Sequence, residues 1–296
     1  MEINYTFIIP HKDSQQLLYR CINSIPQRED IQIIVVDDNS NNKNFDMSFF
    51  AERHVELVLS DKSLTAGGAR NVGLDRAKGK WILFADADDY YVPNFLSVLD
   101  SYTNLYVDIV FFDVDDSTHP KITFSRYHQS IKRQNKDDIV YLKYGMTNVW
   151  CKMFRASMIN RYNIRFECSK KGNDVLFTLL TSFYSKHITI VNTKLYCYTY
   201  LKKSITYSPK SLMDYVEMYK RQIKYNYFVC NVGARILRWS TSGFVFYTLK
   251  ECGIIGFFNF WTYFWKHKKN IYSCRSSYLN VLAKTKNNQG EDILPE

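Results

Sequence analysis

Residues 81–91 read WILFADADDYY, an uninterrupted apolar run followed by three carboxylates. A short apolar run that ends in polar residues is typical of a strand buried on both faces of a parallel sheet. Ligands bind at the carboxyl ends of the strands in such sheets, so we expect Asp86 and Asp88 to lie beside a ligand. One or two carboxylates together with substrate phosphates are usual ligands of Mg²⁺ or Mn²⁺. The alternative is a solvated acidic turn, because aspartate is common in turns.

Strand and helix patterns alternate on both sides of this stretch. We predict strands at 5–10, 31–36, 55–59, 81–85 and 108–112, and helices at 15–25, 45–53, 69–77 and 93–102. The first strand is expected to stop at Pro10, and Gly67 and Gly68 are expected to form a tight loop before the third helix. This alternation predicts an α/β domain with a mainly parallel sheet and flanking helices.

The pattern changes after the fifth predicted strand. Residues 113–146 are polar with little periodicity, and we expect an irregular segment there. Further on we predict strands at 148–154, 188–191 and 195–200, and helices at 156–161, 172–180 and 209–229. Asn173 is a plausible N-cap of the helix that starts near residue 172.

The C-terminal region is rich in aromatic residues and lysine. Residues 253–265 read GIIGFFNFWTYFW and are followed by KHKK. This apolar run is too short to span a bilayer. It matches an interfacial helix lying on an anionic leaflet, and the alternative is a helical cap on the core of the catalytic domain. Residues 284–296 are expected to be disordered.

Composition limits the partners and the compartment. The 296 residues carry a formal net charge of +10, and the excess of lysine and arginine lies mostly after residue 120. This distribution favours contact with a membrane surface over a compact nucleic-acid patch, and no nucleic-acid-binding motif is recognised. The seven cysteines include no Cys-x-x-Cys pair, which indicates reduced thiols in the cytoplasm. The first residues do not have the pattern of a signal peptide.

Two acidic clusters are predicted at the ends of two parallel strands. Asp37 and Asp38 follow the second strand, and Asp86 and Asp88 follow the fourth, with Arg70 between them in the sequence. Carboxylates beside a guanidinium suit a nucleotide diphosphate. We expect Asp38 to accept from the base or the ribose and Arg70 to contact phosphate. Asp86 and Asp88 are expected to hold the metal that bridges the phosphates.

Four motifs in order resemble the family 2 glycosyltransferases of the GT-A fold. They are FIIP at 7–10, VVDDNS at 35–40, GARNVG at 68–73 and ILFADADD at 82–89. The resemblance covers about the first 115 residues closely and continues more loosely to about residue 204. It implies an inverting sugar transfer from a nucleotide-diphosphate sugar, most simply a UDP-sugar, with Mn²⁺ or Mg²⁺ as the cofactor.

The resemblance also implies roles for single residues. Asp38 is expected at the base, Asp86 near the ribose and Asp88 at the metal, while Pro10 ends the first strand at the nucleotide pocket. The catalytic base of the family is usually the aspartate of a Glu-Asp pair that opens a helix. That pair is here Asn173-Asp174, so Asp174 keeps the base and an amide replaces the first acid.

This comparison suggests three regions and a cellular role. Residues 1–205 would form the GT-A catalytic domain, 206–283 a helical region that would associate with a membrane, and 284–296 a tail. The acceptor would be a saccharide or a lipid-linked saccharide in the synthesis of a surface polysaccharide such as capsule or lipopolysaccharide. The protein would then work in the cytoplasm, peripherally at the inner face of the plasma membrane.

Two alternatives remain at the level of sequence. A haloacid-dehalogenase-like, Mg²⁺-dependent phosphotransferase would use Asp86 as nucleophile, but its motif normally opens the first strand of the domain. A non-catalytic protein that binds membranes or nucleic acid is the other alternative. His11 and His128 offer no further guidance, because a lone histidine is more often structural and His128 has no partner that the sequence identifies.

Overall fold

The computed structural model describes residues 2–42, 44–118, 124–201 and 210–273. The chain divides into two compact units, Met1–Ser204 and Ile205–Glu296, which are described separately below. The tail predicted at 284–296 lies outside the described residues.

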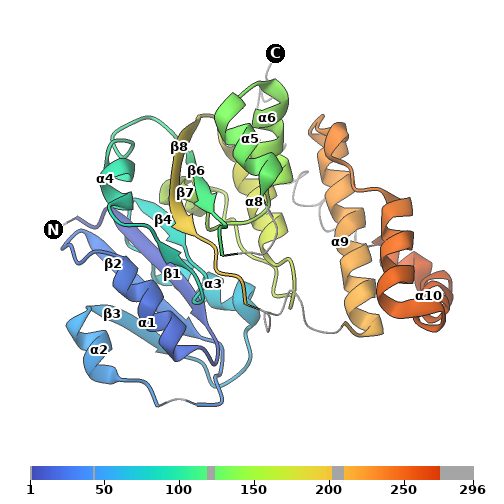
Figure 1. The fold of residues 1–296 in the computed structure, drawn as a ribbon, viewed down its shortest axis with the longest axis horizontal. Helices are drawn as coiled ribbons and strands as arrows, with labels where there is room; N and C mark the ends of the chain where they lie inside the picture. Colours follow the sequence, from blue (N-terminus) through green and yellow to red (C-terminus); the bar gives the residue numbers. More distant parts are fainter. Residues whose placement is uncertain (1, 43, 119–123, 202–209, 274–296) are drawn as a thin grey trace. The chain divides into compact units, whose positions relative to one another are not determined.

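The first unit is built on an eight-stranded mixed sheet with the strand order β3-β2-β1-β4-β7-β6-β8-β5 (Figure 1). The strands are β1 (Tyr5–His11), β2 (Ile31–Asp37), β3 (Val55–Leu59), β4 (Trp81–Phe84), β5 (Tyr90–Tyr91), β6 (Ile109–Asp115), β7 (Lys152–Arg155) and β8 (Ile188–Cys197). Strands β3, β2, β1 and β4 are parallel, whereas β7 runs antiparallel to β4 and β6. The α/β class expected from the sequence is confirmed.

Continuous apolar runs form the centre of this sheet. Every residue of β1 and β4 is buried, as a strand covered on both faces requires. Contrary to expectation, β1 does not stop at Pro10, which pairs in register with Val36. Strand β4, the other neighbour of β1, pairs with it only as far as Ile8. Because Pro10 lies beyond that point, its missing N–H costs no hydrogen bond to β4.

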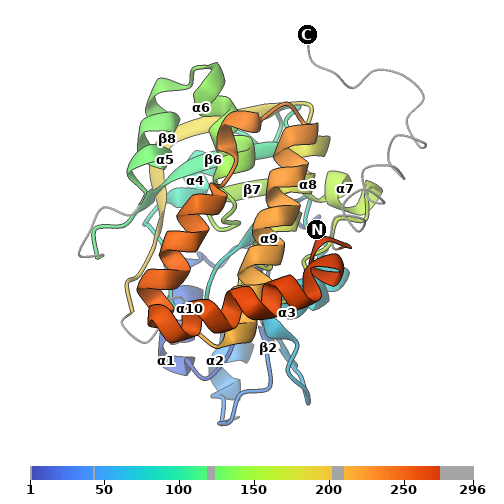
Figure 2. The same cartoon turned by 90° about the vertical axis from the view of Figure 1, so that its right-hand side faces the viewer.

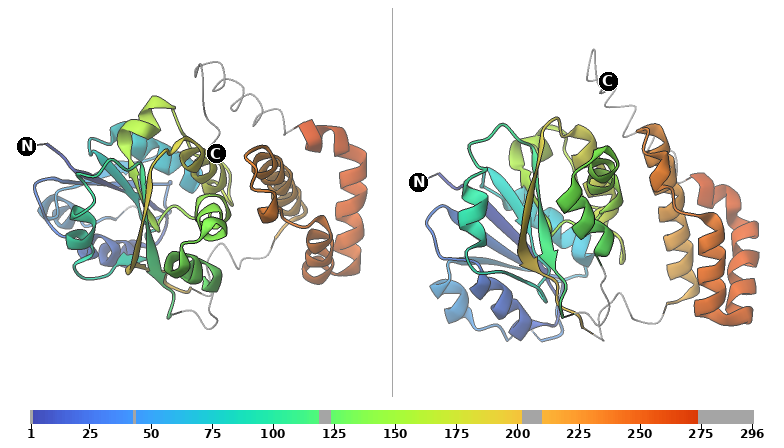
Figure 3. Two further views of the ribbon diagram at one scale, coloured as in Figure 1. Left: turned by 90° about the horizontal axis from the view of Figure 1, so that it is seen from above. Right: turned by 45° about the horizontal axis from the view of Figure 1, so that its top comes forward.

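Helices cover both faces of the sheet. They are α1 (Gln15–Ser24), α2 (Met47–Glu52), α3 (Thr65–Arg76), α4 (Phe95–Asp100), α5 (Ser125–Arg133), α6 (Lys136–Val140), α7 (Ala156–Arg161) and α8 (Asp174–Tyr184). Figures 1 and 3 show α1 and α3 on opposite faces. Right-handed crossovers produce this arrangement, because the strand order runs outward from β1 to β3 and then returns to β4.

The two glycines predicted to form a tight loop lie instead within the first turns of α3. A Cβ on Gly67 would lie 2.2 Å from the carbonyl oxygen of Glu167 and 2.8 Å from Cβ of Asn173. The glycine therefore serves close packing between α3 and the segment that leads into α8, rather than a turn of the backbone.

The segment 113–146, predicted to be irregular, is largely helical where it is described. It contains α5, α6 and a short π-helical turn, η1 (Tyr141–Gly145). In α5 only Tyr127, Ser130 and Ile131 are buried, at the i, i+3, i+4 spacing of one helix face. In addition, the two strands predicted at 188–191 and 195–200 are one continuous strand, β8.

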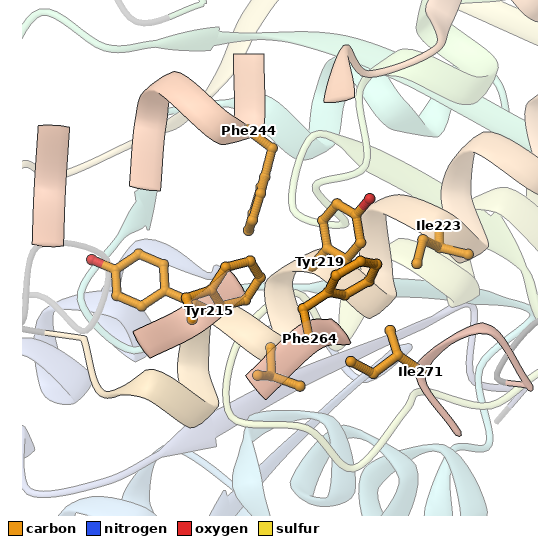
Figure 4. Close-up of a cluster of buried hydrophobic side chains, with 8 residues drawn as sticks. Tyr215, Tyr219, Ile223, Phe244, Phe264 and Ile271 are labelled. Carbon is orange, nitrogen blue, oxygen red and sulfur yellow. The ribbon is translucent and has the colours of Figure 1, made fainter. Parts of the chain in front are cut away.

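The second unit is helical. It consists of α9 (Leu212–Asn231), a short 3₁₀ turn, η3 (Arg235–Leu237), and α10 (Thr241–Ser273). The backbone of α10 is not helical at Gly253 (φ 65°, ψ −177°), and Figure 2 shows its two halves running in different directions. Buried side chains of α9 and α10 pack against each other in one apolar cluster, which Figure 4 shows and which includes Tyr215, Tyr219, Ile223, Phe244, Phe260, Phe264 and Ile271.

Neither α9 nor α10 has a stretch that is both long and apolar enough to cross a bilayer, and the same is true of every other helix that the structure describes.

Candidate functional site

The carboxyl ends of two parallel strands bring the predicted site residues to one edge of the sheet. Strands β2 and β4 lie on either side of β1 and run in the same direction (Figure 1). Asp37 ends β2 and is followed by Asp38, and Asp86 lies two residues after the end of β4. The edge of the sheet at which the sequence predicts a ligand therefore carries both acidic clusters.

The turn after β4 gathers three carboxylates. One oxygen each from Asp86, Asp88 and Asp89 lies within 4.8 Å of the other two. Both oxygens of Asp89 are engaged, because Tyr196 donates its hydroxyl to one at 2.9 Å and the backbone N–H of Thr199 donates to the other at 2.7 Å. Asp89 therefore orients the turn, and Asp86 and Asp88 remain as the candidate metal ligands.

Electrostatic repulsion in this turn favours a cation. Burial, followed by the charge of Asp86, raises the pKa of Asp88 to about 6. Burial and the charges of Asp86 and Asp88 hold the pKa of Asp89 well above its usual range. A divalent cation would offset this repulsion, and two carboxylates joined by substrate phosphates are a donor set that Mg²⁺ and Mn²⁺ accept. These residues therefore fit the expected metal.

Arg70 lies on α3, within the predicted helix, and links two parts of the site. Its Nη2 donates to Asp86 at 2.5 Å, and its Nη1 donates to Oδ1 of Asn173 at 2.8 Å. The side chain of Arg70 is only 7% exposed, and its guanidinium lies 5.4 Å from the ring centre of Phe166. One buried cation therefore joins the acidic turn to the residue that precedes α8.

Asp174 is the first residue of α8 and is partly buried. Burial raises the pKa of its carboxyl, and the nearby charge of Arg70 opposes this shift. No side chain among the described residues hydrogen bonds to the Asp174 carboxylate. A carboxylate without such a donor can accept a proton.

Asn173 does not cap α8 as expected. It occupies the N-cap position, but its side chain makes no capping hydrogen bond. Its Oδ1 accepts from Arg70 instead, and its Nδ2 donates to the carbonyl oxygen of Ser169 at 3.2 Å.

Asp38 lies at the same edge, against the segment that leads into α3. Its Oδ1 accepts the backbone N–H groups of Leu64 and Thr65. Its Oδ2 lies 3.9 Å from the ammonium of Lys12. Pro10 lies near the carboxyl end of β1, between these two acidic clusters in the sheet.

The two histidines have structural partners. His11 is buried, and its Nδ1 lies 2.9 Å from Asp37. His128 does have partners, which the sequence did not identify: its Nδ1 lies 2.6 Å from Asp113 and its Nε2 lies 3.3 Å from Asp116.

Sequence reasoning missed two residues that support the site. The hydroxyl of Tyr196 accepts the backbone N–H of Asp86 at 2.9 Å while it donates to Asp89. Lys152 is completely buried, and its ammonium donates to the carbonyl oxygens of Met146, at 2.7 Å, and Asn148. A lysine inside the apolar run at 149–154 was the available signal for Lys152, whereas Tyr196 had none.

Sequence comparison identifies related proteins over the first unit. The profile described as "Glycosyl transferase family 2" matches residues 6–196. The poly(ribitol-phosphate) beta-glucosyltransferase of Bacillus spizizenii is 26% identical over 229 aligned residues, and the alignment covers 69% of this chain and 34% of that protein. The putative glycosyltransferase EpsH of Bacillus subtilis is 24% identical over 205 aligned residues, and the alignment covers 63% of this chain and 58% of that protein. The chain spans about a third of the length of the first relatives it matches.

Solved structures share the fold. The crystal structure of Staphylococcus aureus TarS 1-349 in complex with UDP-GlcNAc has a TM-score of 0.65 at 18% identity, covering 82% of this chain and 76% of that one. The mannosyltransferase PcManGT from Pyrobaculum calidifontis, in complex with GDP-Man and Mn²⁺, has a TM-score of 0.56 at 10% identity, covering 98% of this chain and 89% of that one. The likeness confirms the expected GT-A type of fold.

Proposed function

The chain belongs to glycosyl transferase family 2, and from this premise we propose that it is an inverting glycosyltransferase. It moves a sugar from a nucleotide-diphosphate sugar to a hydroxyl of a saccharide or lipid-linked acceptor. Residues 1–205 form its catalytic domain. The observation that carries the proposal is the bridge made by Arg70, which connects the acidic turn at Asp86 to the start of α8, where Asp174 has a carboxylate available to act as a base.

The donor is proposed to be a UDP-sugar, bound at the edge of the sheet where β1, β2 and β4 end. Asp38 and Pro10 line the nucleoside side, and Arg70 contacts the diphosphate. The UDP-GlcNAc and UDP complexes of TarS, a protein of similar fold, support this donor class. The names of relatives that glycosylate poly(ribitol-phosphate) support an acceptor in the synthesis of a cell-surface polymer.

Asp86 and Asp88 would hold Mn²⁺ or Mg²⁺. When bound there, the cation offsets negative charge on the departing diphosphate as a Lewis acid. The protein's own residues prepare that position: Tyr196 fixes the turn through Asp89 and the backbone of Asp86, and Arg70 adds a positive charge beside Asp86.

The proposed reaction is a single displacement. Asp174 accepts the proton of the acceptor hydroxyl, and the oxygen attacks the anomeric carbon from the face opposite the diphosphate. The bond from that carbon to the diphosphate oxygen breaks as the new glycosidic bond forms, which inverts the configuration. Arg70 stabilises the charge that develops on the leaving group. The family assignment leaves the phosphotransferase and the non-catalytic alternatives without support.

A panel of UDP-, GDP- and dTDP-sugars tests this function. Nucleotide release is measured with Mn²⁺ or Mg²⁺ and with EDTA, for the wild type and for Asp88→Ala. We expect one donor class to be hydrolysed slowly, with loss of activity in EDTA and in the variant. Asp174→Asn should retain donor binding and lose about 10²–10⁴-fold in transfer to an acceptor. No turnover and no metal-dependent binding of any donor would contradict the proposal.

The second unit is proposed to hold the enzyme at an anionic membrane surface, at the inner face of the plasma membrane. After Gly253, α10 packs one side into the buried cluster through Phe260, Phe264 and Ile271 (Figure 4). Four apolar side chains lie outside that cluster and are each at least 62% exposed: Ile254, Ile255, Phe258 and Trp265.

These four residues share a face of the helix, because Ile255, Ile254 and Trp265 lie three, four and seven positions from Phe258. A group of neighbouring apolar side chains that is exposed together on one face marks an interaction site, whereas single exposed apolar residues are common. Lys266, Lys268 and Lys269 are exposed beside them, and the ammonium of Lys268 lies 5.0 Å from the ring centre of Trp265. A tryptophan among lysines suits the boundary between acyl chains and anionic headgroups.

Vesicle sedimentation tests this role. The full chain should bind phosphatidylcholine vesicles that contain phosphatidylglycerol, and it should release in high salt. The triple variant Ile254→Ser, Ile255→Ser, Phe258→Ser should lose binding. Tyr106→Ser, which alters a side chain that is 82% exposed in the first unit, serves as the matched control and should bind as the wild type does. Equal binding by the triple variant would show that this face does not make the membrane contact.

A further inference from the structure

At position 173, whether the side chain is charged or neutral matters more than its shape. Its Oδ1 accepts from Arg70, and its Nδ2 donates to Ser169, so the hydrogen bonds on both sides define one orientation of the amide. Asn173 is only 7% exposed, and Arg70 is equally inaccessible. The contact between them is therefore screened weakly by water.

The charges at this point leave Arg70 with a single carboxylate partner. Asp86 is the one carboxylate within ion-pair distance of the guanidinium among the residues that the structure describes. Asn173 offers an oxygen acceptor of similar geometry but carries no charge. An aspartate at the same position would divide the guanidinium between two carboxylates, and it would place a second negative charge next to Asp174.

The charged groups around Asp174 come from three elements. Arg70 on α3 and Lys152 on β7 favour its ionised form, whereas Asp86, after β4, opposes it. Burial also opposes it and is the largest influence, raising the pKa of Asp174. The ionised form of Asp174 is thus stabilised by Arg70 and Lys152, and Asn173, the neighbour of Asp174 in sequence, contacts Arg70 directly.

We propose that Asn173 is a positioning residue whose neutral amide holds Arg70 in place without adding a second carboxylate beside Asp86, so that the guanidinium still acts on Asp174 and on the donor diphosphate. This inference rests on the proposed function for its role in transfer. Its electrostatic part concerns the protein alone.

Asn173→Asp keeps the shape of the side chain and adds a negative charge, and it also replaces the N–H that Asn173 donates to the carbonyl oxygen of Ser169 with an oxygen. Arg70 gains a second carboxylate and Asp174 gains a negative neighbour, and both changes disfavour ionisation of Asp174. We expect the titration midpoint of the Asp174 carboxyl to rise by about one pH unit. The acid limb of the transfer rate should move upward with it, and the affinity for UDP should fall several-fold.

The midpoint is measured directly by ¹³C NMR of the aspartate carboxyl carbons in the metal-free full chain, with Asp174→Asn used to assign the resonance. Asn160→Asp is the matched control, because it adds the same charge to an exposed residue of α7. The control should leave the midpoint unchanged. Asn173→Ser removes the amide without adding charge, so the midpoint should rise less than in Asn173→Asp.

Three results would overturn the inference: no upward shift in Asn173→Asp, an equal shift in Asn160→Asp, or an equal shift in Asn173→Ser. Should Asn173→Asp not fold, the serine variant decides, because a large rise there would assign the effect to packing. The titration requires no turnover. An absence of sugar transfer in the wild type would therefore contradict the proposed function and leave the electrostatic result to stand by itself.

Discussion

The hydroxyl of Tyr196, near the end of β8, donates to a carboxylate oxygen of Asp89 at 2.9 Å. The same hydroxyl accepts the backbone N–H of Asp86 at 2.9 Å, so it holds both ends of the acidic turn. The ring of Tyr196 stacks on Trp150, with an interplanar angle of 7°. A phenol fixed by packing thus supports the carboxylates that would hold the metal.

Tyr196→Phe should destabilise the protein and weaken metal binding together. The change leaves the buried carboxylate of Asp89 and the N–H of Asp86 without this partner, which should cost about 1–3 kcal/mol in the free energy of unfolding. Urea denaturation measures that cost, and Mn²⁺ titration measures the binding. Tyr127→Phe is the control, because its buried hydroxyl donates to the carbonyl oxygen of Phe112, outside the acidic turn. Equal losses of Mn²⁺ affinity in both variants would contradict a specific role for Tyr196.

Asp88 should make both stability and metal binding depend on pH. Its pKa is about 6 in the folded chain and 3.8 in the reference state, so the folded state binds more protons between those values. The stability of the metal-free protein should therefore fall as the pH rises from about 4 to about 6, by at most about 3 kcal/mol. Mn²⁺ requires the ionised carboxylate, so its affinity should rise over the same window.

Asp88→Asn is the corresponding variant. It should flatten this part of the stability profile, stabilise the metal-free protein at neutral pH and abolish Mn²⁺ binding. Urea denaturation across the pH range and Mn²⁺ titration measure the two effects. A stability profile that is unchanged in the variant would assign the dependence to another group, such as Asp89.

The central strands could be predicted from sequence because their signal is local. Largely apolar runs at 5–10, 31–36 and 81–84 indicate strands that are buried on both faces, and the acidic residues that follow the second and third of them lie at one edge of the sheet. The supporting contacts could not be predicted, because they join distant parts of the chain. Tyr196 lies 110 residues from Asp86, and no local pattern encodes such a pairing.

Local signals also misled where packing decided the structure. Glycine usually marks a turn, but Gly67 lies inside α3. A glycine is needed there because Glu167, a hundred residues later, approaches it closely. In α5 the apolar pattern rests on Tyr127 and Ile131 alone, which was too weak to predict a helix. Asn173 has the residue type of an N-cap, yet a buried arginine uses its side chain instead.

Gly67→Ala should therefore disturb the site without touching any proposed ligand. The added Cβ would lie 2.2 Å from the carbonyl oxygen of Glu167, and either α3 or the segment before α8 has to move. Overpacking of this kind should cost about 1–3 kcal/mol, measured by urea denaturation, and should lower transfer more than donor binding. Gly243→Ala is the control, because its nearest contact would be an ordinary 3.5 Å. Full activity in Gly67→Ala would show that the contact is not needed.

The charge of Lys152 should lower the pKa of Asp174, the proposed base. Its ammonium is completely buried, burial lowers its pKa, and its charge favours the ionised form of Asp174. Lys152→Met removes that charge, so the pKa of Asp174 should rise and the acid limb of the transfer rate should move to higher pH. Lys152→Arg keeps the charge and should shift the limb less, although it strains the packing. Lys143→Met, which removes a partly buried lysine of η1, should leave the pH profile in place. If the methionine and arginine variants shift the limb equally, Lys152 acts on the loop at Met146 and Asn148 through its hydrogen bonds and not through its charge.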